Sequence, residues 1–236
     1  MTMLAIQVGQ GAFIGMFVLI AALIIAGIIW GAAQKKKRRL ALEAWAGLRG
    51  LSFDPEDDDT LARNFPAFKP LHTGSRRYAY NVMTGEVERG YVCAFDYHYE
   101  TYSTDSKGNR TTHHHHFSCV VVESGLFLKP LTIRAENFFD KMKGAFGFDD
   151  IDFESAEFSR KFWVTSKHKR WAYDVIHQET MELLLKSPRF AIELDGPHAL
   201  ARRGKRFKPI EFDQALALLW GVLDRIPSDL QKDLRG

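Results

Sequence analysis

The sequence predicts an α+β protein with one N-terminal transmembrane helix, then a mostly antiparallel sheet packed with two or three helices. Three observations predict this fold. Residues 11–33 (GAFIGMFVLIAALIIAGIIWGAA) form a long apolar run without charge. Residues 74–134 alternate apolar and polar side chains and are rich in Tyr, Val and Phe, as strands are. Helical spacing of apolar residues returns in the last third of the chain.

The apolar run is followed at once by five consecutive cations, Lys35, Lys36, Lys37, Arg38 and Arg39. At 1.5 Å per residue, a helix over 11–33 spans about 30 Å of hydrocarbon, which indicates a transmembrane helix. Because no Lys or Arg precedes it, the positive-inside rule places the N-terminus outside and the remainder in the cytoplasm, under the inner membrane. A cleaved signal peptide would carry its charge before a shorter apolar region, so the sequence favours a retained single-pass anchor.

Two features of the anchor suggest partners. We expect the five cations to contact anionic lipid headgroups, at about 1 kcal/mol each, although they serve equally well as a topology signal alone. Gly11 with Gly15, and Gly27 with Gly31, repeat a spacing that lets two helices approach closely and predicts a homo-oligomer. Glycine is common in membrane helices, so tolerated small residues are the competing interpretation.

We divide the chain into three parts: an N-terminal segment and transmembrane helix (1–34), a basic juxtamembrane helix and linker (35–73), and a cytoplasmic α+β domain (74–236). Within the last part, 74–134 should form a β-meander and 135–236 a helix and strand region. The formal net charge of +3 comes with the basic block, so composition gives no indication of a nucleic-acid partner. Cys93 and Cys119 are expected to be small buried hydrophobic residues.

The first elements after the span follow from local signals. The membrane helix should continue to Gly47 or Gly50, and a new helix should begin at Asp54 and Pro55. A hairpin is predicted over 77–102 with its turn at Thr84 and Gly85. A third strand over 111–122 should then turn at Ser124 and Gly125 into a fourth, in which Pro130 indicates an edge or a bulge.

The last third reads as alternating helices and strands. A short helix is expected near 135–148, a strand over 150–154 and another through Val164. A helix capped by Ser166 should run to Lys186, and two strands should turn at Gly196 and Pro197. The final helix should begin near Pro209 and stop at Pro227.

The candidate metal ligands are histidines. In a strand, His113 and His115 face one way and His114 and His116 the other, so at most two of the four can converge on one ion. With the right register, His98 of the preceding strand supplies a third ligand, which gives a candidate site for zinc or another transition metal at His98, His113 and His115. A polar strand face explains the same residues without an ion, and a pH sensor is a further alternative.

A second candidate metal site, made of acidic residues, lies in the segment DDIDFES, where Asp150, Asp152 and Glu154 would share one face of a strand and suit Mg²⁺ or Ca²⁺. Buried Ile151 and Phe153 with solvated acids explain the same pattern.

The segment EFSRKFWVTSKHKRWAYDVIHQETMELLLKSPRFAIELDG resembles a family of uncharacterised bacterial membrane-anchored proteins, and so do LALEAWAGLRGLSF, GSRRYAYNVMTGEV and FDYHYETY. In that family, hydrophobic N-terminal segments precede a cytoplasmic α+β domain. The shared residues are hydrophobic framework positions. The resemblance implies no activity, cofactor or binding residue, and the histidine run lies outside the shared pattern.

No phosphate-binding, dinucleotide, hydrolase or zinc-protease motif occurs in the sequence. We therefore expect a membrane-anchored cytoplasmic interaction or scaffold module with an unknown protein partner, more readily than an enzyme. The alternative is a metal-binding sensor or metal-dependent enzyme that uses His98 with His113 and His115, or Asp150 with Asp152.

Overall fold

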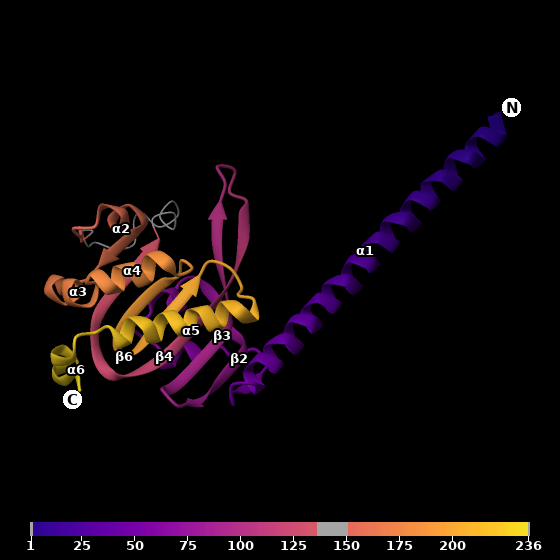
Figure 1. Cartoon of the computed structure of the whole chain (residues 1–236). Helices are drawn as coiled ribbons and strands as arrows, with labels where there is room; N and C mark the ends of the chain where they lie inside the picture. The colour runs from indigo at the N-terminus through magenta and orange to yellow at the C-terminus, as the bar shows by residue number, and fades with distance from the viewer. Residues whose placement is uncertain (1, 136–150, 236) are drawn as a thin grey trace. The chain divides into compact units, whose positions relative to one another are not determined.

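The computed structural model describes residues 2–135 and 151–235 (Figure 1). The chain divides into two compact units, Met1–Ala44 and Trp45–Gly236. The predicted short helix near 135–148 falls largely outside the described residues.

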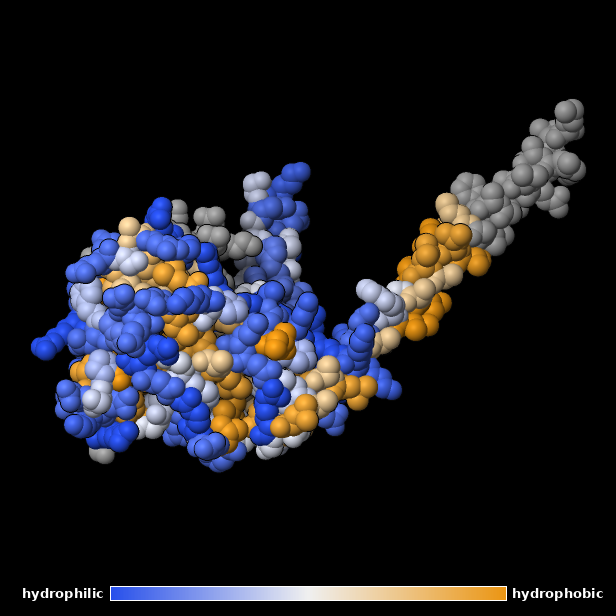
Figure 2. Space-filling view, in the orientation of Figure 1, coloured by the Kyte–Doolittle hydropathy of each residue, from blue (hydrophilic) through white to orange (hydrophobic). Residues whose placement is uncertain are grey.

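Residues 2–44 of the first unit lie within one continuous helix, α1 (Thr2–Gly47). It continues through the basic block to Gly47, as the sequence predicts. Within Met16–Gly47, an 18-residue window has a mean hydropathy of 2.6 and none of it is buried. Figure 2 shows apolar side chains along this part of the helix. The helix is therefore long and apolar enough to cross a membrane.

The second unit is built on one antiparallel sheet whose strands follow the order β1-β2-β3-β4-β5, with β6 paired to β4. The strands are β1 (Ser52–Asp54), β2 (Ser75–Val87), β3 (Gly90–Thr104), β4 (Arg110–Ala135), β5 (Phe162–Thr165) and β6 (Ala191–Arg203). The ends of β3 and β4, with their connecting turn, project from the domain (Figure 1). We call residues 101–113 the β3–β4 arm.

Helical segments complete the α+β fold. They are η1 (Leu61–Asn64), η2 (Lys69–His72), α2 (Ala156–Lys161), α3 (Lys169–Val175), α4 (Gln178–Lys186), α5 (Pro209–Asp224) and α6 (Ser228–Leu234). One sheet face packs on the segment 61–72 through Phe65, Phe68 and Leu71. The opposite face carries Ser118, whose Oγ accepts a hydrogen bond from Phe207 N just before α5. Core therefore lies on both sides of the sheet.

The predicted hairpin over 77–102 is present, but its turn lies elsewhere. Val87 pairs with Gly90, so residues 88 and 89 form the turn, and Thr84 lies inside the ladder opposite Cys93. Gly90 has a φ of 123°, a conformation that glycine adopts without strain. The Thr84–Gly85 pair resembled a turn by composition, but the pairing of β2 with β3 continues through it, with Gly85 opposite Val92.

Two further predicted turns are bulges inside long strands. Residues on both sides of Ser124–Gly125 belong to β4, and residues on both sides of Gly196 belong to β6. Gly125 and Gly196 have φ values of 68° and 54°, and the β4–β6 register shifts between Glu123 and Leu131. A bulge needs the same permissive backbone as a turn, so the glycines alone do not distinguish the two. The shift also bears out the bulge expected at Pro130.

The remaining differences are local. No helix begins at Asp54; Asp58 Oδ1 instead accepts hydrogen bonds from the backbone of Thr60 and Leu61, where η1 begins. The helix expected from Ser166 to Lys186 is divided into α3 and α4. The strand predicted over 150–154 is absent from the part of it that the structure describes, residues 151–154. The helix expected to be the last one, α5, begins at Pro209 as predicted and ends at Asp224, before Pro227, but a further helix, α6, follows it.

Candidate functional site

The β3–β4 register decides which histidines meet. His98 lies opposite His116, Glu100 opposite His114, and Thr101 opposite His113. Side chains alternate between faces, so His114 and His116 share a face with His98, whereas His113 and His115 lie on the other face. The structure therefore does not bring His98 together with His113 and His115.

His113 and His115 have partners of their own. The His115 ring stacks on Tyr99 with 4.5 Å between ring centroids, and its Nε2 lies 2.7 Å from Thr101 Oγ1. His113 Nε2 lies 2.7 Å from Ser103 Oγ. Hydroxyl and aromatic neighbours thus account for both residues without a metal ion.

A different cluster forms where the β3–β4 arm leaves the sheet: His98, Glu100 and His114. Their nearest ligand atoms all lie within 4.8 Å of one another. His98 Nε2 lies 3.2 Å from His114 Nδ1, which in turn lies 3.5 Å from Glu100 Oε1. His98 and Glu100 are each only 4% exposed, while the His114 side chain is 59% exposed. The cluster is therefore buried at His98 and Glu100 and open to solvent at His114.

Strand β2 positions the buried histidine through a bulge. The β2–β3 register shifts between Ser75 and Tyr78, and Arg76 has a φ of 47°, in the left-handed region that only glycine favours. The Arg76 carbonyl accepts a hydrogen bond of 3.1 Å from His98 Nδ1. Because a carbonyl oxygen only accepts, Nδ1 carries a proton, and neutral His98 therefore has its lone pair on Nε2.

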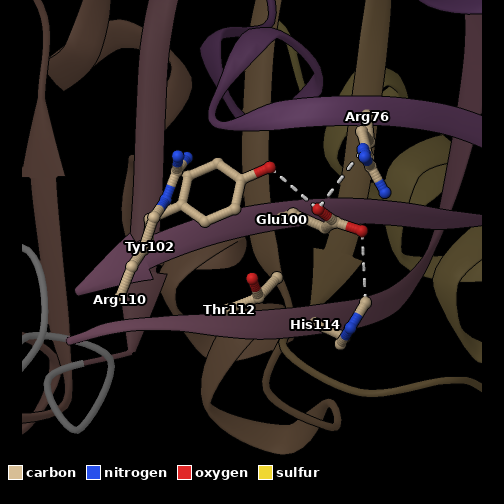
Figure 3. Close-up of a pocket in the computed structure, with 6 residues that line it drawn as sticks. All are labelled: Arg76, Glu100, Tyr102, Arg110, Thr112 and His114. Atoms are coloured by element: carbon tan, nitrogen blue, oxygen red, sulfur yellow. Dashed lines mark hydrogen bonds and ion pairs between the residues drawn. The ribbon is translucent and has the colours of Figure 1, made fainter. Parts of the chain in front are cut away.

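Glu100 lies at the centre of a solvent-open hollow of about 380 Å³ (Figure 3). Its Oε2 accepts a 2.9 Å hydrogen bond from the Tyr102 hydroxyl and lies 3.8 Å from Arg76 Nε. Ser75 Oγ donates in turn to the Tyr102 hydroxyl at 3.1 Å. Arg110 covers the Tyr102 ring, with its Cζ 3.6 Å from the centroid. The hollow is lined by Arg76, Glu100, Tyr102, Arg110, Thr112 and His114.

The polar face continues into the domain as a buried network. Asp96 is fully buried, and its Oδ2 accepts a 3.0 Å hydrogen bond from Asn81 Nδ2. Ser118 Oγ donates to the other carboxylate oxygen. Asn81 lies at the second register shift of β2 and has a φ of 50°. Both left-handed residues of β2 thus serve the face that carries His98.

Burial shifts the pKa values of two groups whose rings lie beside that of His98, His116 and Tyr78. Desolvation lowers the pKa of His116, and the nearby His98, Arg206 and His114 lower it further while Asp96 opposes them. Desolvation also raises the pKa of Tyr78, whose ring lies 4.6 Å from that of His98 between centroids. Both groups are held toward their neutral forms.

The other candidate residues are not members of this cluster. Lys35, Lys36 and Lys37 are exposed on α1, where they directly follow the apolar stretch. Asp152 and Glu154 are exposed, and Asp150 lies outside the described residues. Sequence reasoning missed Glu100 and His114. Glu100 could have been found from the sequence, because residues two apart in a strand, such as His98 and Glu100, share a face. His114 could not, because its place beside them depends on the β3–β4 register.

No protein-family model matches the chain, and no curated protein is similar enough to it to count as a match. One solved structure is similar in fold: the mycobacterial trehalose monomycolate transport factor A, TtfA, with a TM-score of 0.55 and 14% sequence identity. The alignment covers 79% of this chain and 93% of that chain. At this identity the likeness concerns the fold alone. The chain thus shares with a bacterial protein the fold that its sequence predicts, and it carries one apolar N-terminal helix.

Proposed function

We propose that this protein is anchored in the inner membrane by a single N-terminal span and presents its α+β domain in the cytoplasm as an accessory or scaffold module. The observation that carries the proposal is α1, in which an exposed apolar stretch leads directly into five cations. The cations favour the cytoplasmic side for the domain and would contact anionic headgroups there.

An accessory role agrees with the shape of the polar hollow and with the structural neighbour. The hollow around Glu100 is open to solvent, whereas small-molecule sites are concave enough to bury most of their ligand. TtfA is named as a transport factor, and by analogy we propose that this domain assists an integral membrane protein. The β3–β4 arm, which is exposed from Tyr102 to Arg110, is the part of the domain that we propose reaches the partner.

The span itself supports self-association. A Cβ atom built at Gly27 or Gly31 would meet no atom within 4 Å in the described residues, so this strip of helix is open to close approach. The pair Gly11 and Gly15 repeats the spacing. We propose a homo-oligomer through one of these two pairs.

Anchoring and orientation are tested with the full-length protein in bacterial cells. We expect it to remain in the membrane after alkaline carbonate washing, and a C-terminal green fluorescent protein to fluoresce while a C-terminal alkaline phosphatase stays inactive. The matched variant replaces residues 35–39 by glutamine and should lower this asymmetry. Release by carbonate, or an active phosphatase fusion on the unaltered chain, would contradict the anchor or its orientation.

The accessory role is tested by site-specific photo-crosslinking in cells. A photoreactive residue at Lys107, at the tip of the β3–β4 arm, should give one discrete adduct with an integral membrane protein, identified by mass spectrometry. The control position is Lys232 in α6, which is also exposed on the same domain. Adducts with lipid or with the protein itself alone, or the same adducts at both positions, would contradict the role proposed for the arm.

A further inference from the structure

His114 Nδ1 lies between two hydrogen-bond acceptors. His98 Nε2, which carries a lone pair, is 3.2 Å from it, and Glu100 Oε1 is 3.5 Å from it. A single proton on His114 Nδ1 can point fully at only one of them. One cation bound by all three atoms would satisfy His98 Nε2 and Glu100 Oε1 together, with His114 carrying its proton on Nε2 instead.

We propose that His98 Nε2, Glu100 Oε1 and His114 Nδ1 bind one Zn²⁺ ion or a transition ion of similar preference. Two imidazole nitrogens and one carboxylate oxygen are a ligand set that zinc takes, and bonds of about 2.0–2.2 Å in a tetrahedron place ligand atoms about 3.3–3.6 Å apart. The distances of 3.2 Å and 3.5 Å at His114 Nδ1 therefore match two edges of such a tetrahedron.

Each buried ligand is already oriented by a second residue. The Arg76 carbonyl holds His98 through Nδ1, which leaves Nε2 for the ion, and the Tyr102 hydroxyl holds Glu100 through Oε2, which leaves Oε1. Partners of this kind fix the tautomer of a ligating histidine and the rotamer of a ligating carboxylate. The left-handed Arg76 is the device that points its carbonyl at His98, and strain of this kind gathers at functional sites.

The burial of Glu100 favours a bound cation, although Arg76 and Arg110 also line the hollow. Glu100 is 4% exposed, and its contact with Arg76 is long, at 3.8 Å, with an arginine side chain that is 77% exposed. Buried carboxylates are usually paired closely or coordinate a metal. The exposed side of His114 leaves a fourth position facing the hollow, where a water molecule would complete the tetrahedron.

The experiment measures zinc binding to the untagged full-length protein in detergent, by competition with a chromophoric chelator. The test variant is His114→Gln, at an exposed position where the fold should be kept. The matched control is the double variant His113→Gln and His115→Gln, which alters the same histidine run on the other face. We expect His114→Gln to weaken binding by about 100-fold or more and Tyr102→Phe by about tenfold. The control should change binding by less than about threefold.

Co²⁺ provides a second readout that does not depend on affinity. The unaltered protein and the control should give the intense visible absorption of a tetrahedral Co²⁺ site, and Glu100→Gln should lose it. Zinc should also raise the thermal midpoint of the unaltered protein but not of His114→Gln. Absence of zinc binding by the unaltered protein would overturn the proposal, and so would equal losses in His114→Gln and in the control. Circular dichroism establishes that each variant is folded.

Discussion

Asn81 Nδ2 donates a hydrogen bond of 3.0 Å to Oδ2 of Asp96, and the carboxylate that receives it is fully buried. Asn81 does so from a left-handed backbone conformation, at a register shift in β2. Asn81 therefore affects stability in two ways, through the hydrogen bond of its side-chain amide and through its strained backbone.

These two effects can be separated with two variants. Asn81→Gly removes the hydrogen bond while easing the backbone, and we expect it to lower the free energy of unfolding by about 1–3 kcal/mol. Asn81→Ala removes the same bond but keeps a Cβ atom at positive φ, which should cost about 1 kcal/mol more. Denaturant unfolding of the full chain in mild detergent measures both. Equal losses would mean that the bulge stores no strain.

Glu193 lies between two buried arginines, 3.4 Å from Arg202 Nε and 4.0 Å from Arg134 Nη2. Burial lowers the pKa of Arg134, and the Glu193 carboxylate opposes that shift. Glu193→Gln would leave two buried cations without this counter-charge, so we expect a loss of about 3–5 kcal/mol in unfolding free energy. The control, Glu182→Gln, breaks an exposed pair with Lys186 and should change stability very little. A loss of the same small size in both variants would contradict the role of Glu193.

Gly74 approaches the strand that carries the candidate ligands. A Cβ atom there would clash with the Glu100 carbonyl oxygen, and Gly74 has a φ of 73°. Gly74→Ala should therefore cost about 2 kcal/mol or more, because both backbone strain and a clash must be relieved. Gly108→Ala, at a φ of 85° with no atom within 4 Å of the added Cβ among the described residues, should show only the strain. Thermal unfolding of both variants is the measurement, and a larger loss at Gly108 would exclude the clash.

The two cysteines should be inert in the folded protein. Burial raises the pKa of Cys93 to about 12, and it also raises that of Cys119. Both thiols therefore stay protonated at pH 8, and a thiol reagent should label them only after denaturation, as mass spectrometry would detect. Rapid labelling of native protein would show that the core opens.

The same shift predicts alkaline destabilisation. Because the folded pKa of Cys93 lies above its ordinary value of 9.0, its contribution to stability is full below pH 9 and is lost as the pH rises toward 12. Burial raises the pKa of Tyr97 to about 12 as well, which acts in the same direction above pH 10. Cys93→Ala should flatten the fall in unfolding free energy between pH 9 and 10.5. An unchanged slope would point to Tyr97 and other groups.

Sequence alone predicts those parts of the fold that depend on interactions within one segment and not on the pairing of distant segments. The continuous helix through Gly47 and the start of α5 at Pro209 follow from apolar periodicity and local capping chemistry. The turns at Gly125 and Gly196 were wrong because glycine serves a bulge as readily as a turn, and only the pairing of β4 with β6 distinguishes them.

The sequence could predict that histidines of this hairpin form a candidate metal site, but not which histidines belong to it. Alternation along the strand correctly separates His113 and His115 from His114 and His116, but it does not state which pair faces His98. That choice depends on the β3–β4 register, which is set by the turn over 105–109 and its hydrogen bonds to Asp105. The contribution of Arg76 could not be predicted from the sequence, because Arg76 holds His98 through its backbone carbonyl and not through its side chain.

Strand β4 pairs with β3, β5 and β6, so a single stretch of 26 residues is common to three ladders. Inserting one residue within it would move every side chain on the C-terminal side of the insertion to the opposite face of the sheet. Lengthening is tolerated at the tip formed by 105–109, where the chain turns in solvent. Natural variation in size, and any engineered split or circular permutation, should therefore concentrate at that tip and spare the rest of the strand.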